Sequence, residues 1–268
     1  MNLQAVTVGQ YFPGHSLLHR LDPRTKIMAV LLLSIAIFLP RGWMGYALTA
    51  AFTISAVVLS QVPPRFILRG LRPILVFLGI AVVFNAFLTP GEALYHIGKM
   101  TITREGLILS AVASVRLVLL VVTASLMTLT TSPIQLTDGL ERLLRPFTPL
   151  GVPAHELALM MTIALRFIPT LAEEADRIMR AQMARGADFQ SGNLVNRVKG
   201  LIPVMVPLFV AAFRRADELA TAMEARGYRG GKGRTRMKEL FLTGIDYVGG
   251  VALLAYTAAI VYLRVTGR

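Results

Sequence analysis

Long apolar segments without charged side chains follow one another along most of this chain, and they constrain the fold more than any other feature. Hydrophobic residues make up 54% of the sequence and charged residues 16%. Soluble domains carry about a quarter charged residues. Because roughly 20 consecutive apolar residues can cross a bilayer as a helix, the sequence predicts an all-α integral membrane protein.

Five segments are expected to span the membrane, and turns rich in Pro and Gly separate them. The connections include a basic loop broken by prolines at 61–72 and a polar loop of mixed charge at 92–105. The five segments cover residues 23–39, 43–59, 73–88, 106–130 and 240–263. The first is long enough only if the helix begins at Pro23, where Asp22 is a good N-cap. Two shorter apolar segments, 157–168 and 201–213, are expected to pack in a core or at an interface. As additional spans they would raise the total to seven.

Basic residues are distributed unevenly between the expected loops, which predicts the orientation of the chain. Most of the 28 Lys and Arg residues lie on one side of the membrane if the N-terminus is cytoplasmic. We therefore expect three parts. They are a membrane domain with four spans over residues 1–130, a cytoplasmic domain over 131–238, and a last span over 239–268.

Composition and spacing disfavour several classes of function. The net charge of +13 agrees with a positive-inside bias and with anionic lipid, and no nucleic-acid-binding motif is recognisable. The chain has no Cys, which excludes disulfides and thiol chemistry. No Walker A motif or nucleophile–base pattern is present. The carboxylates at 173, 174, 176 and 217 are interpreted as solvated or paired with Arg, so we expect a non-catalytic chain that binds no metal or cofactor.

Arg116 is the only charged residue in the fourth expected span. A charge at this depth is costly and normally faces the protein interior, where it is functional or paired. Two interpretations of Arg116 stand equally. It is either a structural charge, held by an ion pair or by backbone carbonyl groups, or a functional charge. No Asp or Glu lies deep in any expected span, which disfavours a proton-coupled transporter.

A short amphipathic helix is predicted over residues 133–145, between the fourth and fifth spans. Ser132 is a good N-cap and Pro133 suits the first helical position. Its leucines, Leu140 and Leu144 among them, fall on one face. This helix is expected to lie on the membrane surface or on the protein, or to be an ordinary surface helix.

An internal repeat occupies the expected cytoplasmic domain. EEADRIMRAQMARG begins at Glu173 and RRADELATAMEARG begins 41 residues later at Arg214. Both copies are rich in helix-forming residues and end in Ala-Arg-Gly, where Gly takes a positive φ at low cost. One Arg at a helix end could simply complement the helix dipole. Two equivalent ends indicate two equivalent partners.

Four segments, spread over nearly the whole chain, carry a family resemblance. They are HRLDPRTK at 19–26, TPGE at 89–92, and the two repeat segments at 164–186 and 214–230. Together they resemble the transmembrane T component of energy-coupling factor transporters (EcfT). The resemblance implies a non-catalytic subunit in the plasma membrane of a prokaryote, which joins two ABC-type ATPase subunits to a small substrate-binding S component. ATP and Mg on the ATPases would drive the import of vitamins or related micronutrients.

The resemblance also implies which residues meet these partners. The ends of two long crossing helices, Ala184-Arg185-Gly186 and Ala225-Arg226-Gly227, would dock in grooves of the ATPases. Arg pairs bidentately with carboxylates, so the two arginines are expected to dominate binding. A platform for the S component would consist of Leu140, Leu144, Leu157, Met160, Met161, Leu165, Met205, Leu208 and Phe209.

Other functions stay open at this point. The sequence of the repeat resembles that of T components that are shared by several S components. The alternative is a T component dedicated to a cobalt, nickel or biotin importer. A conventional permease, a membrane enzyme acting on lipid and a scaffold without a role in transport are further alternatives. The missing intramembrane carboxylates disfavour the permease, and no catalytic cluster can be assembled for the enzyme.

Overall fold

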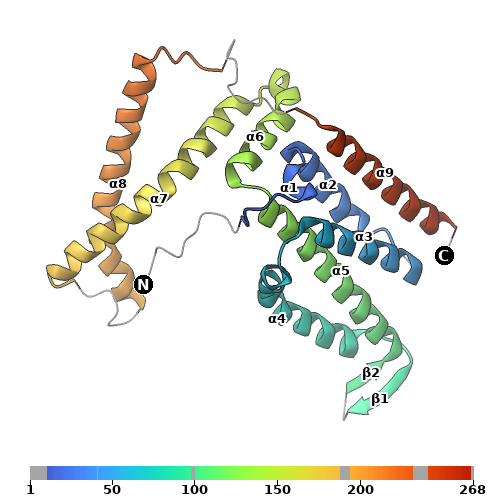
Figure 1. Cartoon of the computed structure of the whole chain (residues 1–268). Helices are drawn as coiled ribbons and strands as arrows, with labels where there is room; N and C mark the ends of the chain where they lie inside the picture. Colours follow the sequence, from blue (N-terminus) through green and yellow to red (C-terminus); the bar gives the residue numbers. More distant parts are fainter. Residues whose placement is uncertain (1–10, 41, 98–99, 188–193, 232–240, 267–268) are drawn as a thin grey trace. The chain divides into compact units, whose positions relative to one another are not determined.

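Helices account for nearly all of the structure, as the sequence predicts (Figure 1). The computed structural model describes residues 11–40, 42–97, 100–187, 194–231 and 241–266. In chain order the elements are α1 (Leu17–Arg20), α2 (Pro23–Ala36), α3 (Trp43–Ser60), α4 (Pro64–Leu88), β1 (Ala93–Ile97), β2 (Met100–Thr103), α5 (Arg104–Thr130), α6 (Pro133–Leu144), η2 (Arg145–Leu150), α7 (Ala154–Ala184), α8 (Leu194–Ala225) and α9 (Gly244–Val265). The predicted helical membrane class is confirmed, with one short β-hairpin in addition.

The chain divides into two compact units. The membrane unit comprises Gln10–Gly139 and Leu240–Arg268 and contains α1 to α5 and α9. The paired-helix unit comprises Met1–Gly9 and Leu140–Glu239 and contains α7 and α8. The chain therefore leaves the membrane unit within α6 and returns to it before α9.

Among the described residues, five helices are long and apolar enough to cross a membrane, but the set differs from the predicted one by one helix. They are α3, α4, α5, α7 and α9. α2 has only 14 residues, because it ends at Ala36 and the chain turns through Pro40 before α3 begins. α7 qualifies because it is a helix of 31 residues whose first half is apolar with few charges, although its second half is charged. The expected first span is therefore shorter than predicted.

α4 begins nine residues earlier than the expected third span, and the predicted basic loop before Pro73 is helical. Pro64 occupies the first helical position, where its missing N–H costs nothing, so the proline starts the helix instead of breaking the chain. Pro73 lies inside the helix. The loop prediction was wrong because Pro63 and Pro64 were interpreted as breakers.

Residues 92–105 were expected to form an irregular polar loop, but they contain the antiparallel hairpin of β1 and β2. Its strands have five and four residues, too few for a strand periodicity to stand out in the sequence. The hairpin leads directly into α5. The hydroxyl of Thr103 donates to the carbonyl of Thr89 at 2.8 Å and accepts the backbone N–H of Gly106 at 3.1 Å, which caps α5.

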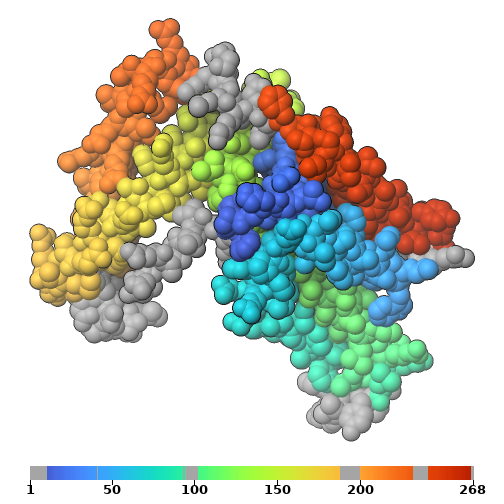
Figure 2. Space-filling model, viewed as in Figure 1, coloured from blue at the N-terminus to red at the C-terminus, as the bar shows by residue number. Residues whose placement is uncertain are grey.

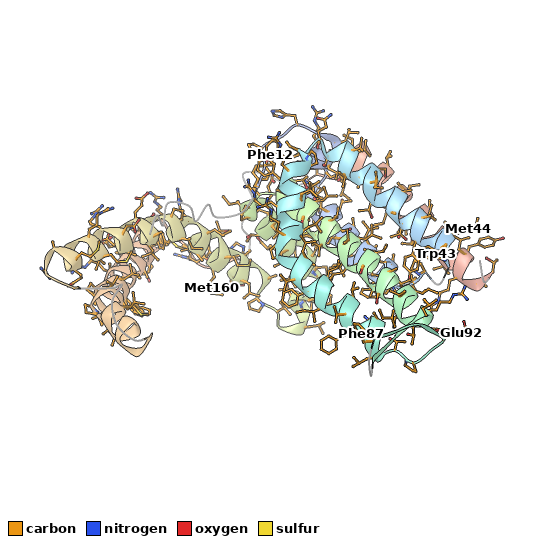
Figure 3. All side chains as sticks on the ribbon, turned by 90° about the horizontal axis from the view of Figure 1, so that it is seen from below. Phe12, Trp43, Met44, Phe87, Glu92 and Met160 are labelled. Carbon is orange, nitrogen blue, oxygen red and sulfur yellow. The ribbon has the colours of Figure 1, made fainter. Side chains whose placement is uncertain are left out.

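Two hydrophobic clusters form the core of the membrane unit. The first joins α2 to α9 and consists of Leu33, Ala36, Leu253, Tyr256 and Ile260. The second joins α4 to α5 and consists of Val62, Ile67, Val122, Leu126 and Leu129. Elsewhere many large apolar side chains are exposed, such as Trp43 and Met44 at the start of α3 (Figure 3). Such a surface is expected of helices that face lipid.

The HRLDPRTK segment ties three helix ends together inside the membrane unit. Asp22 caps α2, and its own backbone N–H donates to Asp246 at the start of α9, at 2.7 Å. The Lys26 ammonium is buried and donates to the carbonyl of Thr130, the last residue of α5, at 2.9 Å. Because the last carbonyls of a helix lack partners within the helix, Lys26 satisfies one of them. We call Asp22, Lys26, Thr130 and Asp246 the helix-end clasp.

Candidate functional site

α7 and α8 carry the internal repeat and form the candidate site. They have 31 and 32 residues, and helices of this length extend for about 47 Å. Ala, Leu, Met and Glu favour helix throughout both copies. Pro169 in α7 and Pro203 and Pro207 in α8 lie inside the helices without ending them. Figure 2 shows both helices, yellow and orange, exposed along much of their length.

α7 ends in a closed Schellman turn at the first Ala-Arg-Gly. Arg185 is the C-cap and Gly186 adopts φ +89°. The N–H of Gly186 donates to the carbonyl of Met183 at 3.0 Å, and the N–H of Ala187 donates to that of Gln182 at 3.0 Å. These are the two hydrogen bonds that define the Schellman motif. The predicted left-handed Gly is confirmed.

α8 ends in the same way at the second Ala-Arg-Gly. Gly227 adopts φ +73°. Its N–H donates to the carbonyl of Glu224 at 2.8 Å, and the N–H of Tyr228 donates to that of Met223 at 3.0 Å. The repeat in sequence is therefore a repeat in backbone geometry, and each turn satisfies two of the last carbonyl groups of its helix.

The two arginines at these ends are exposed. Arg185 and Arg226 both have high solvent exposure, and neither forms an ion pair with another described residue. A guanidinium group keeps its charge at any working pH and offers a planar fork of N–H donors. Each helix end therefore presents an exposed cation that fits a carboxylate or another anion.

The small residues beside each Arg leave the helix end uncrowded. Ala184 and Ala225 are exposed, and no atom lies within 4 Å of a Cβ added to Gly186 or Gly227. Glycine is required at these two positions by the positive φ and not by lack of space. The site at each tip is thus a narrow helix end with one long cationic side chain.

Two contacts show that α7 and α8 run antiparallel, and Figure 1 shows them crossing. Glu174 pairs with Arg215 at 3.3 Å, and the Gln182 side chain donates to the carbonyl of Pro203 at 3.5 Å. Moving along α7 towards its end therefore means moving towards the start of α8. The expectation that the acidic residues of the repeat are solvated or paired with Arg is confirmed for Glu174.

The antiparallel arrangement separates the two apolar halves along most of their length. The apolar half of α8 contacts the charged half of α7 at Gln182, and the apolar half of α7 lines a hollow with the end of α8 around Arg226. The halves approach one another where Phe167 and Val206 line a common groove. The predicted platform residues thus lie on three helices of one unit and not on one continuous helix face.

Most of these platform residues are solvent-exposed. Leu157, Met160, Met161, Met205 and Phe209 are between 37% and 57% exposed. Leu140 and Leu144 on α6, and Leu165 and Leu208, are half-buried. Exposed apolar side chains in such number are typical of a surface that meets lipid or another protein.

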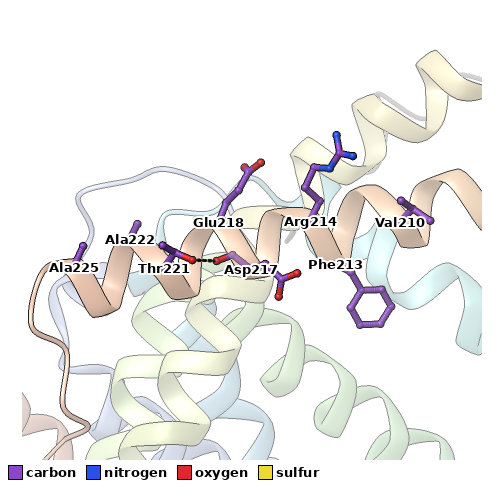
Figure 4. Close-up of a pocket in the computed structure, with 8 residues that line it drawn as sticks. All are labelled: Val210, Phe213, Arg214, Asp217, Glu218, Thr221, Ala222 and Ala225. Carbon is purple, nitrogen blue, oxygen red and sulfur yellow. Dashed lines mark hydrogen bonds between the residues drawn. The ribbon is translucent and has the colours of Figure 1, made fainter.

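A further hollow lies along one face of α8 and shows no catalytic arrangement (Figure 4). Its lining consists of Val210, Phe213, Arg214, Asp217, Glu218, Thr221, Ala222 and Ala225. The hydroxyl of Thr221 donates to the backbone carbonyl of Asp217 at 2.9 Å, so it is not poised as a nucleophile. Within the described ranges, no group of three His, Asp or Glu side chains could hold a metal ion.

Arg116 lies in α5 among groups that suit a structural charge. Its guanidinium donates to the carbonyl of Pro40 at 3.4 Å. It also lies 5.8 Å from the ring centre of Phe38 and 5.6 Å from that of Tyr46. A carbonyl and two aromatic faces stabilise a cation where water is scarce.

Known proteins are similar to this chain over nearly its whole length. Residues 14–237 match the family model CbiQ, described as cobalt transport protein. The energy-coupling factor transporter transmembrane protein EcfT of Acidaminococcus fermentans is 53% identical over 262 residues, which cover 98% of both chains. The protein of the same name from Thermosediminibacter oceani is 54% identical over 250 residues, 93% of this chain and 94% of the relative.

A more distant relative agrees with these two. The EcfT protein of Bacillus subtilis is 48% identical over 263 residues, which cover 98% of this chain and 99% of the relative. Together with the helical membrane fold and the doubled Ala-Arg-Gly ends, these matches leave no doubt about the family. The chain belongs to the CbiQ family and is a multi-pass EcfT protein, the transmembrane component of an energy-coupling factor transporter.

Proposed function

We propose that this chain is the coupling subunit of an ATP-driven importer, in which it joins two ABC-type ATPase subunits to a membrane S component that binds the substrate. The observation that carries the proposal is the pair of identical helix ends, each with an exposed Arg. ATP and Mg would bind to the ATPases, and this chain would transmit their movement. The N-terminus would be cytoplasmic, in the plasma membrane of a prokaryote.

The two tips support docking on acidic grooves. Arg185 and Arg226 extend from rigid turns, so little order is lost when an ATPase groove binds them. A carboxylate in such a groove would form a charge-assisted pair with the guanidinium fork. An Arg buried in an interface is among the residues whose loss costs most binding energy.

The exposed apolar residues support binding of the S component. Met160, Met161, Met205 and Phe209 leave apolar surface uncovered. Met is flexible and polarizable, and it is common on surfaces that bind several partners. This composition suits a shared module that accepts different S components for vitamins or related micronutrients.

A component dedicated to cobalt uptake is the second candidate. The description of the matching family names cobalt transport, whereas the curated relatives at about 50% identity carry the name EcfT without a substrate. The repeat at the two tips suits either importer, because it concerns the ATPases and not the substrate. We favour the shared module, and uptake assays with several S components distinguish the two.

Co-purification with the ATPases tests the docking proposal. The tagged chain is expressed with two candidate ATPases and reconstituted in nanodiscs, as the natural sequence and as Arg185→Glu/Arg226→Glu. We expect the natural chain to retain both ATPases and the double reversal to lose them, because a carboxylate on each tip would repel an acidic groove. Arg177→Glu, an exposed reversal on the same helix, is the matched control. Equal recovery of ATPases by the double reversal and the control would contradict the proposal.

A further inference from the structure

The two copies of the repeat differ in charge at the point where they begin. The first starts with Glu173-Glu174 and the second with Arg214-Arg215. The next two residues, Ala-Asp, are the same in both copies, and so is the final Ala-Arg-Gly. The charges are therefore opposite at two successive pairs of equivalent positions, and they are opposite again at Arg177 and Glu218 three residues further on.

The structure brings one of these pairs of positions together. Glu174 and Arg215 form an ion pair at 3.3 Å, and their separation in sequence is 41 residues, the offset of the repeat. The two side chains are 22% and 33% exposed, so the pair is partly shielded from water. Two Glu or two Arg side chains at this distance would repel each other. The opposite charges therefore fit this antiparallel contact, and matching charges would not.

We infer that the Glu174–Arg215 ion pair sets the register of α7 against α8 and thereby the spacing of the two Arg tips. Apolar side chains allow neighbouring registers, since they have no directional bonds, whereas an ion pair between two fixed positions does not. Slippage by one helical turn would displace one tip by about 5.4 Å relative to the other.

The ion pair stands at the same interval from both tips. Arg185 follows Glu174 by 11 residues and Arg226 follows Arg215 by 11 residues, which corresponds to about 16 Å of helix in each case. In antiparallel helices the two tips then point in opposite directions from this pair. A single contact can therefore hold both tips in a symmetric arrangement relative to it.

The contacts on either side of the pair follow the repeat as well. Gln182 of α7 donates to the carbonyl of Pro203 of α8. The repeat-equivalent residues are Met223 of α8 and Thr162 of α7, and both line one hollow. Repeat-equivalent residues are thus near one another on both sides of the ion pair. The inference deepens the proposed function and rests on it for its meaning in transport, but the register itself can be measured without any ATPase.

A distance measurement between the tips tests the register. The chain lacks Cys, so Met183→Cys and Glu224→Cys place two spin labels at exposed, repeat-equivalent positions. Double electron–electron resonance is recorded on the full chain in nanodiscs. We expect Glu174→Arg to shift and broaden the distance distribution, Arg215→Glu to do the same, and the exchange Glu174→Arg/Arg215→Glu to restore it. Arg177→Glu is the control and should leave the distribution unchanged.

Neutral variants keep the test decisive if a reversal prevents folding. Glu174→Gln and Arg215→Gln remove the ion pair without introducing repulsion, and each should broaden the distribution. The inference is overturned if the single variants match the control, or if the exchanged pair stays as perturbed as the single reversals. In the reconstituted complex, substrate imported per ATP hydrolysed should fall in the single reversals and recover in the exchange. If the distances respond as expected but Arg185→Glu/Arg226→Glu still recovers the ATPases as well as the control does, the docking proposal alone is contradicted.

Discussion

The helix-end clasp of the membrane unit and the two helix tips of the paired-helix unit use the same chemistry for opposite purposes. Both are charged groups at the ends of helices. In the clasp, Asp22, Lys26 and Asp246 are buried, and their partners belong to the same unit. At the tips, Arg185 and Arg226 are exposed without an ion pair to any described residue. Charges with internal partners hold the fold, whereas charges without them are available for recognition.

Removing a carboxylate of the clasp should have the largest effect on stability. Asp246 accepts hydrogen bonds from the backbone N–H groups of Asp22 and Thr243 and from the Thr243 hydroxyl. Asp246→Ala leaves these donors without a partner in a buried place, so we expect a loss of about 3 kcal/mol in the free energy of unfolding. Thermal unfolding of the chain in detergent measures it. A melting temperature equal to that of the natural chain would show that water replaces Asp246.

Changing the tip glycines should have a smaller effect, confined to the helix ends. Gly186→Ala and Gly227→Ala force an L side chain into a positive φ, which costs about 1 kcal/mol each. Gly250→Ala in α9 is the control, because its added Cβ meets no atom within 4 Å and its φ is ordinary. Hydrogen exchange at the last turns of α7 and α8 checks the prediction. Faster exchange only in the tip variants is the expected result.

An exposed ion pair should contribute least to the stability of the fold. Arg104 and Glu92 lie 3.9 Å apart, with side chains 66% and 79% exposed. Solvent screens such a pair, so Arg104→Ala should change the free energy of unfolding by about 0.5 kcal/mol or less. Chemical denaturation of Arg104→Ala and of the natural chain under the same conditions measures this difference. A loss as large as that of Asp246→Ala would mean that burial does not separate the two kinds of charge.

Local features of the chain were predictable from sequence, and contacts between distant segments were not. The turns at Gly186 and Gly227 follow from a residue preference that acts within a few positions, so the repeat predicts both. The length of α2 and the early start of α4 depend on how prolines are used, and each Pro permits more than one outcome. The Lys26 contact with Thr130 joins residues 104 positions apart, which no spacing rule indicates.

The same distinction between local features and contacts of distant segments applies to the candidate site. The sequence identifies the Ala-Arg-Gly ends and suggests that acidic residues of the repeat pair with Arg, but it does not name the partner. A signal was present in the repeat, because the first copy has Glu173 and Glu174 where the second has Arg214 and Arg215. Of these equivalent positions, Glu174 and Arg215 form an ion pair in the structure.

The closed turns at the two tips have a consequence for the speed of a transport cycle. Each turn is already closed by two backbone hydrogen bonds, so neither tip has to fold when a partner arrives or unfold when it leaves. Preformed surfaces associate faster than surfaces that must first change shape. In the proposed complex, each tip can therefore meet its partner with the backbone conformation that it already has.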